Sequence, residues 1–137
     1  MNGIIEFERV LGYRSIAPGQ APLPAIPVGL IGPGGTDDAV AILDTGAQYS
    51  IFNGQRTSVL GIELASGKRI RFESLGGGMY GWLHSITLEI EGFRFPCEVL
   101  FSNGYIRREL LGRHTVFDQI TIGIREKYRS IYFSPRP

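Results

Sequence analysis

The sequence predicts an all-β protein, and three observations support that class. Several short segments alternate apolar and polar residues with the period of two that a half-buried strand requires, most clearly residues 68–75 and 83–101. Glycine occurs 19 times in 137 residues, about twice its usual share, which favours many tight turns. Only residues 106–119 carry a good helix pattern, so we expect one short helix of about two turns near the C-terminus, with Gly112 at or near its entry.

The length and charge of the chain limit the number of domains and the kinds of binding partner that we expect. A chain of 137 residues that is 43% hydrophobic fits one compact domain, so we interpret residues 1–137 as a single domain whose residues 1–25 form an N-terminal extension or a strand. The 14 basic and 13 acidic residues nearly balance, which gives no support for binding nucleic acid or an anionic membrane. No segment approaches the ~20 apolar residues of a membrane span, and no signal peptide is recognisable. We therefore expect a cytoplasmic protein.

The first part of the chain reads as strands separated by turn residues. Apolar and β-branched residues predict a strand within residues 4–13, which ends before Ala17-Pro18-Gly19. Prolines exclude a central strand from residues 21–27. Residues 26–32 and 39–46 are apolar and flank a turn that begins Pro-Gly-Gly, so together they predict a β-hairpin.

The second part predicts further hairpins around glycine-rich turns. Residues 54–64 permit one short helical turn, and the strand over residues 68–75 then runs into a glycine-rich stretch, residues 76–82, that we interpret as a flexible tip. The alternation in residues 83–101 breaks at Glu91-Gly92, so two strands meet at a tight turn there. Residues 120–135 predict a closing hairpin that turns near residues 125–127.

One short stretch raises a chemical question. Residues 41–50 read AILDTGAQYS, in which an apolar strand runs directly into Asp44. Taken alone, Asp44 fits a turn-capping residue, because Asp side chains often bond to the backbone of a turn. Two further features follow at a distance, however. The first is the glycine-rich stretch between two alternating strands, and the second is an apolar pair followed by glycine and arginine, Leu110-Leu111-Gly112-Arg113.

This constellation resembles the retropepsin-like aspartic proteases, the single-domain relatives of pepsin that include the retroviral proteases. The resemblance covers roughly residues 26–134 and implies an acid-protease fold, a closed β-barrel domain. It also implies hydrolysis of peptide bonds by two carboxyl groups. One carboxylate activates a water molecule while a second, protonated carboxyl donates to the scissile carbonyl. Because the chain has one such aspartate, the resemblance implies a homodimer in which each subunit contributes Asp44.

The resemblance also assigns roles to neighbouring residues. Thr45 would bond across to the partner subunit, Gly46 would let the backbone approach a peptide substrate, and Ala47 is small, as in the retroviral enzymes. The glycine-rich stretch matches the flap, a hairpin that closes over bound peptide; its residues are Gly76, Gly77, Gly78, Met79 and Tyr80. The element that packs behind the catalytic loop is matched by Leu111, Gly112 and Arg113.

Two departures from the family pattern keep an alternative open. Retroviral members pair the arginine of that element with an acidic residue, but the matching position here is Gln48. The C-terminal hairpin is also longer than a retroviral one. The alternative is a catalytically weak or inactive dimerisation or peptide-binding module with the same fold. A third reading is a site that assembles only when a larger partner or high concentration drives dimerisation.

The remaining reactive side chains read as structural. His84 and His114 lack metal-ligand spacing, and no metal or other cofactor is implied. Cys97 is the only cysteine and lies in an apolar strand, so we interpret it as a buried core thiol, with a reactive thiol as the alternative. Asp118 is a weaker catalytic candidate than Asp44, because it follows the predicted helix and fits a local capping role.

Overall fold

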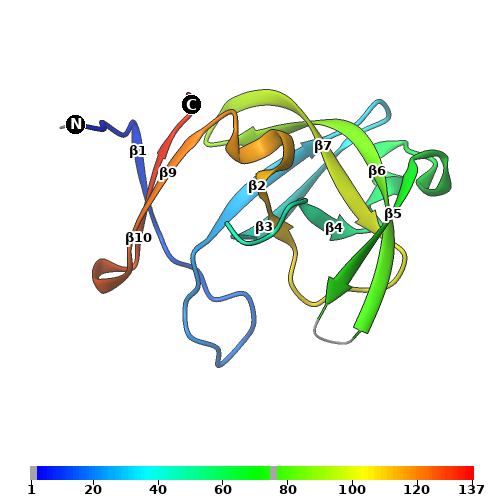
Figure 1. The fold of residues 1–137 in the computed structure, drawn as a ribbon, viewed down its shortest axis with the longest axis horizontal. Coiled ribbons are helices and arrows are strands. Elements are labelled where there is room, and N and C mark those ends of the chain that lie inside the picture. Colours follow the sequence, from blue (N-terminus) through cyan, green and yellow to red (C-terminus); the bar gives the residue numbers. More distant parts are fainter. Residues whose placement is uncertain (1–2, 75–76) are drawn as a thin grey trace.

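Ten strands in two sheets make up most of the computed structural model, which describes residues 3–74 and 77–137 (Figure 1). The larger sheet has seven strands in the spatial order β2 (Ala25–Ile31), β3 (Thr36–Leu43), β8 (Leu110–Leu111), β4 (Ile51–Asn53), β7 (Phe93–Ser102), β6 (Gly77–Ile90) and β5 (Lys68–Ser74). β2 also pairs with β6 over three residue pairs. β2, the first strand in this order, therefore also lies against β6, the sixth.

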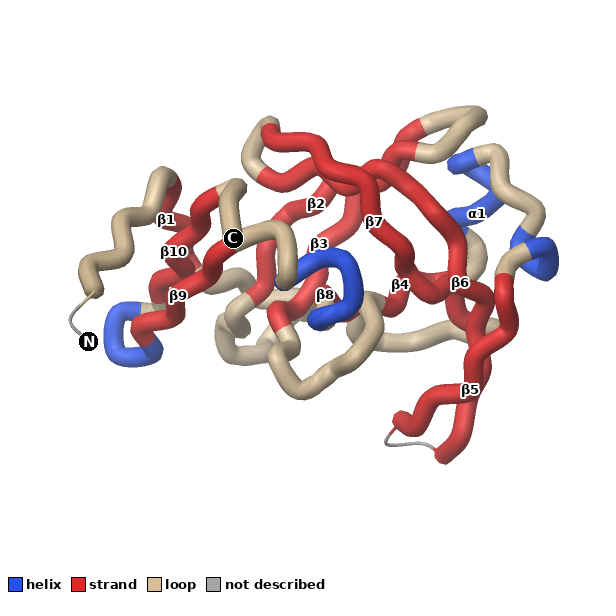
Figure 2. The backbone as a smooth tube through the Cα atoms, turned by 45° about the horizontal axis from the view of Figure 1, so that its top comes forward, coloured by secondary structure: helices blue, strands red, loops and turns tan. Residues whose placement is uncertain are grey.

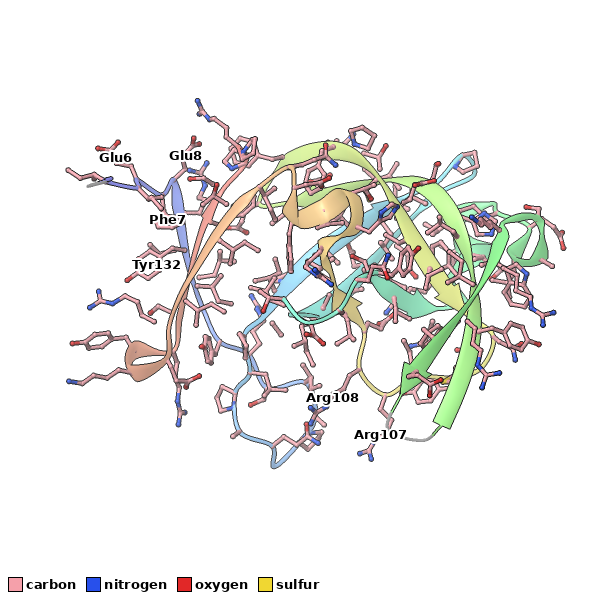
Figure 3. The ribbon with its side chains drawn as sticks, in the orientation of Figure 1. Glu6, Phe7, Glu8, Arg107, Arg108 and Tyr132 are labelled. Atoms are coloured by element: carbon pink, nitrogen blue, oxygen red, sulfur yellow. The ribbon has the colours of Figure 1, made fainter. Side chains whose placement is uncertain are left out.

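The smaller sheet joins the two ends of the chain. It contains β1 (Arg9–Gly12), β10 (Ser130–Ser134) and β9 (Thr121–Arg125), all antiparallel. The segment before β1 continues along this sheet, and Figure 3 shows Phe7 beside Tyr132, with ring centroids 5.5 Å apart. The closing hairpin turns at η3 (Glu126–Tyr128), as the sequence predicts.

Both sheets contribute to one hydrophobic core. In β3 the buried side chains alternate with more exposed ones, which is the pattern of a strand with one face inward. The largest fully buried side chains include Phe52, Phe101, Phe133, Ile26, Leu30 and Leu111. Cys97 belongs to this core, and burial raises the pKa of its thiol to about 12. The interpretation of Cys97 as a core thiol is confirmed.

The helical segments are short, and one sequence prediction needs correction. The single regular α-helix within the described residues is α1 (Arg56–Leu60), where the sequence permits a helical turn; η1 (Leu64–Ser66) follows it. Within residues 106–119 the helical element is η2 (Arg113–Phe117), and His114 and Thr115 inside it have non-helical dihedral angles. The helix begins next to Gly112 as expected but is shorter than two regular turns, and the earlier part of the helix-favouring segment is not helical, because Leu110 and Leu111 pair with β3. Sheet pairing here outweighs the helix propensity of the two leucines.

A second correction concerns the glycine-rich stretch. Gly77, Gly78, Met79 and Tyr80 are not a flexible tip but belong to β6, where they pair with β5 up to Ser74 opposite Gly77. Gly76 lies outside the described residues. Glycine is compatible with extended backbone, so glycine content alone does not separate a tip from a strand. The pairing of β6 with β7 begins only at Gly81, and Figure 2 shows the β5–β6 hairpin projecting beyond the rest of the sheet.

No helix in the described part of the chain combines the length and the apolar character needed to cross a membrane.

Candidate active site

Asp44 lies immediately after the end of β3 in a tight backbone loop. Its N–H donates to the carbonyl oxygen of Leu111 at 2.9 Å, and its own carbonyl oxygen accepts from the N–H of Ala47 at 3.1 Å. The Gly46 N–H donates to Asp44 Oδ1 at 3.0 Å, which orients the carboxyl group. A side-chain Cβ at position 46 would lie 3.3 Å from that same oxygen. The sequence Asp-Thr-Gly therefore holds one carboxylate in a defined direction.

Gly112 supports this loop from behind. A Cβ built on Gly112 would lie 2.5 Å from the carbonyl oxygen of Tyr49 and 2.9 Å from that of Ala47, so only glycine fits. The next two N–H groups continue the contact: Arg113 donates to Ala47 at 3.0 Å and His114 donates to the Gln48 carbonyl at 2.7 Å. The structure thus brings the two motifs of the sequence together, with Leu111 and Gly112 directly against the Asp44 loop.

Ser50 completes the support, and sequence reasoning missed it. Its side chain is fully buried, and its Oγ accepts a hydrogen bond from the Gly112 N–H at 2.9 Å. A buried hydroxyl needs such a partner, because an unpaired polar group in the core is costly. In the sequence Ser50 carries no signal for this role, since its partner is 62 positions away.

The front of the loop is open to solvent. Asp44 is half-buried, whereas Thr45, Gly46 and Gln48 are exposed. Within residues 3–74 and 77–137, the Thr45 hydroxyl has no hydrogen-bond partner, and the Arg113 side chain forms no ion pair or hydrogen bond with Gln48. Arg113 is exposed.

The β5–β6 hairpin carries the residues that the sequence assigns to a flap. Tyr80 packs edge-on against Trp82, with ring centroids 5.3 Å apart, and the Arg69 guanidinium lies 4.5 Å from the Tyr80 ring centroid. These contacts hold the side chains in the part of the hairpin that lies nearer the rest of the sheet. A Cβ at Gly78 would meet the Arg71 side chain, so small size at this position leaves room for Arg71.

Residues 103–109 join the hairpin to the Asp44 strand. At one end the Asn103 N–H donates to the Tyr80 carbonyl oxygen at 2.9 Å. At the other end the Glu109 carbonyl oxygen accepts from the Ile42 N–H at 2.9 Å. In between, Asn53 exchanges two hydrogen bonds with the backbone of Ile106. This segment therefore has a defined position between the two candidate parts of the site.

A buried ion pair anchors that segment, and sequence reasoning missed it as well. Arg56 in α1 forms two hydrogen bonds to the Glu109 carboxylate, at 2.7 Å and 2.6 Å, and a third to Asp37 at 2.8 Å. The side chain of Glu109 is only 9% exposed. Hydrogen bonding to Glu109 raises the pKa of Arg56. Because 53 positions separate the partners, no local sequence signal marks them.

Two surface depressions lie away from Asp44. One is lined by the segment before β1 and by the C-terminus, including Phe7, Glu8 and Arg136; the other lies between the β2–β3 hairpin and the β6–β7 turn. Among the described residues, no group of three or more His, Cys, Asp or Glu side chains is placed to hold a metal ion. A single chain thus offers an oriented carboxylate on an open surface.

The sequence matches no protein-family model and no curated protein. Among solved structures, the fold is similar to that of a retropepsin-like aspartic protease from Rickettsia conorii, with a TM-score of 0.59 and 15% identity, over 79% of this chain and 88% of that one. It is also similar to EIAV protease in complex with an inhibitor, with a TM-score of 0.51 and 18% identity, over 71% of this chain and 88% of that one. The chain has a retropepsin-like all-β fold, and the predicted fold class is confirmed.

Proposed function

We propose that this protein is an aspartic endopeptidase that acts as a homodimer, with Asp44 of each subunit forming a catalytic dyad. The observation that carries the proposal is the Asp44 loop on a retropepsin-like fold. The carboxylate is oriented by the Gly46 N–H, supported from behind by Gly112, and open to solvent in front. Neighbours with this fold are aspartic proteases, and that chemistry requires a carboxylate in such a setting.

The dimer supplies the second carboxyl group, which one chain lacks. Two carboxyl groups held side by side cannot both ionise, so they share one proton, and the aspartic proteases are the established example of this behaviour. The Asp44 carboxylate takes a proton from water as the water oxygen bonds to the scissile carbonyl carbon. The protonated Asp44 of the partner subunit donates its proton to the carbonyl oxygen. The tetrahedral intermediate then breaks its C–N bond: the carboxyl that took the water proton donates it to the leaving nitrogen, and the other carboxylate takes a proton from one hydroxyl of the intermediate, which restores the shared proton of the dyad.

Other exposed groups fit this assembly. The Thr45 hydroxyl has no partner within the described part of its own chain and is available to a second subunit. The projecting β5–β6 hairpin serves as the flap that covers the substrate and excludes water, which strengthens the electrostatic interactions of the dyad. A cleft formed between two subunits also agrees with the open surface at Asp44 in one chain, because each subunit provides only one wall.

The experiment is a comparison of cleavage by three chains. A denatured protein mixture is digested at mildly acid pH with the natural chain, with Asp44→Asn and with Asp118→Asn, each with and without a statine inhibitor that mimics the transition state. Asp44→Asn is expected to lower the rate at least about a hundred-fold, since it removes the general base. Asp118→Asn is the matched control, because Asp118 is exposed and lies outside the Asp44 loop.

The same experiment also distinguishes the peptidase from a dimerisation or peptide-binding module without activity. If the natural chain sediments as a dimer but cleaves nothing, the peptidase proposal fails and a dimerisation or peptide-binding module remains. The observation that favours this alternative is the exposed Arg113 side chain, which has no ion-pair partner within residues 3–74 and 77–137, whereas the resemblance implies an acidic partner at position 48. Equal activity of the natural chain and Asp44→Asn would place the chemistry at another residue.

A further inference from the structure

The segment of residues 103–109 carries two adjacent arginines that the proposed mechanism does not use. Arg107 and Arg108 are both exposed, and neither forms an ion pair or a hydrogen bond through its side chain within residues 3–74 and 77–137. Figure 3 shows both side chains reaching away from the sheet on the side of the molecule where the β5–β6 hairpin projects. They are therefore available to a ligand that lies beside that hairpin.

The acidic residue next to these arginines does not neutralise them. Glu109 directs its carboxylate to Arg56, which holds both of its oxygens at 2.7 Å and 2.6 Å. Glu109 Oε2 also accepts from the Asn53 N–H at 2.9 Å. With these bonds satisfied and the side chain almost fully buried, Glu109 cannot turn to pair with a neighbour. Two positive charges consequently remain uncompensated on a backbone segment that is anchored at both ends.

The segment of residues 103–109 places the two arginines near Asp44. Its last residue bonds to Ile42 in the strand that ends at Asp44, and the Asp44 N–H bonds to Leu111. Arg108 is three residues before Leu111, so the two Cα atoms lie no more than about 11 Å apart, the span of a fully extended chain at roughly 3.3–3.6 Å per residue. A peptide that lies extended across Asp44 advances by the same amount per residue. A substrate side chain within three or four residues of the scissile bond can therefore contact the arginine side chains.

We propose that Arg107 and Arg108 form a subsite that selects peptides with an aspartate or glutamate within about four residues of the scissile bond. The inference rests on the proposed function, because it takes Asp44 as the point of cleavage. Guanidinium groups recognise carboxylates through paired, charge-assisted hydrogen bonds, which explains why arginine suits this task. Because both arginines are exposed, each contact adds a modest amount and the preference is sensitive to salt.

The test is a cleavage-site profile of a denatured proteome digested by the natural chain and by the double variant Arg107→Gln/Arg108→Gln. The natural chain is expected to enrich Asp and Glu about five-fold near the scissile bond, relative to their background frequency. The double variant is expected to lose this enrichment while it still cleaves sites that lack acidic residues. Raising the salt to about 0.5 M is expected to weaken the preference of the natural chain.

A matched control removes the same charge elsewhere. The variant Arg94→Gln/Lys127→Gln loses two exposed cations, Arg94 near the start of β7 and Lys127 in η3, and it is expected to keep the profile of the natural chain. Thermal unfolding of all variants checks that they fold. A profile without acidic enrichment, or one that changes equally in both double variants, overturns the subsite.

A binding experiment separates this failure from failure of the proposed function. The same peptide mixture is passed over immobilised Asp44→Asn chain, with and without Arg107→Gln/Arg108→Gln, and the retained peptides are identified by mass spectrometry. Retention of acidic peptides that depends on the arginines supports the subsite, even if the natural chain cleaves nothing and the peptidase proposal falls. Cleavage without any acidic preference in either assay overturns the subsite and leaves the peptidase proposal standing.

Discussion

At the scale of single residues, Gly112 is the position where the structure makes the strictest demand. The Gly112 Cα faces the backbone of the Asp44 loop so closely that a methyl group would lie 2.5 Å from the Tyr49 carbonyl oxygen. Backbone atoms cannot move aside as a flexible side chain does. The Asp44 carboxylate is held in place only as long as the residue behind its loop has no side chain.

Gly112→Ala is therefore expected to destabilise the fold by about 1–3 kcal/mol and to abolish most of the proposed activity, because it displaces the Asp44 loop. Chemical denaturation measures the first effect and the cleavage assay the second. Gly104→Ala is the matched control, since the nearest atom to its Cβ is the end of the Met79 side chain at 3.7 Å. Equal stability of the two alanine variants would contradict the close packing described for Gly112.

The residue scale also shows what the sequence does and does not reveal. Asp44, Thr45 and Gly46 are contiguous and form a recognisable motif, so the candidate catalytic loop is predictable. Ser50 and Glu109 support that loop and the neighbouring segment through partners more than fifty positions away. A hydrogen bond over such a separation depends on the folded topology, and a single sequence contains no periodic or local pattern that records it.

At the scale of elements, the ion pair between Arg56 and Glu109 ties α1 to the segment before β8. Arg56 is 21% exposed and Glu109 9% exposed, so water screens this pair little. Asp37 near the start of β3 bonds to the same guanidinium. One side chain thus connects three elements around the strand that carries Asp44.

Arg56→Ala is expected to lower the free energy of unfolding by about 3 kcal/mol, because it leaves the Glu109 carboxylate buried without its partner. Arg94→Ala, which removes an exposed pair with Glu89, is expected to cost less than about 1 kcal/mol. Urea denaturation of both variants gives the comparison. If the two variants lose the same free energy, the Arg56–Glu109 pair is not an anchor of this segment.

The elements differ in how far the sequence predicts them. The sequence places β2, β3, β5 and β7 within about three positions, whereas β6 begins at Gly77, six positions before the predicted strand. The short helix expected next to Gly112 is present as η2, but Leu110 and Leu111 before it find partners in β3 and β4. Parallel pairing over such a distance has no local signature. The glycine-rich stretch read as a tip is the start of β6 for a different reason: it pairs antiparallel with the neighbouring β5, and glycine content alone does not separate a tip from a strand.

At the scale of the whole molecule, the chain has a retropepsin-like fold but offers a single Asp-Thr-Gly loop. The proposed chemistry needs two carboxyl groups, so it ties activity to association of two chains. The first 25 residues have no counterpart in the resemblance drawn from the sequence. The structure gives part of them a role, because β1 pairs with β10 and completes a sheet from both chain ends.

The most direct test of the central claim is the activity of a fixed amount of natural chain as Asp44→Asn chain is added and allowed to exchange subunits. If the dyad needs Asp44 from both subunits, an equal amount of added Asp44→Asn chain draws natural subunits into inactive mixed dimers and lowers the activity to about half. A larger excess lowers it further. Activity that stays constant as Asp44→Asn chain is added would show that each subunit works alone and would contradict the shared dyad.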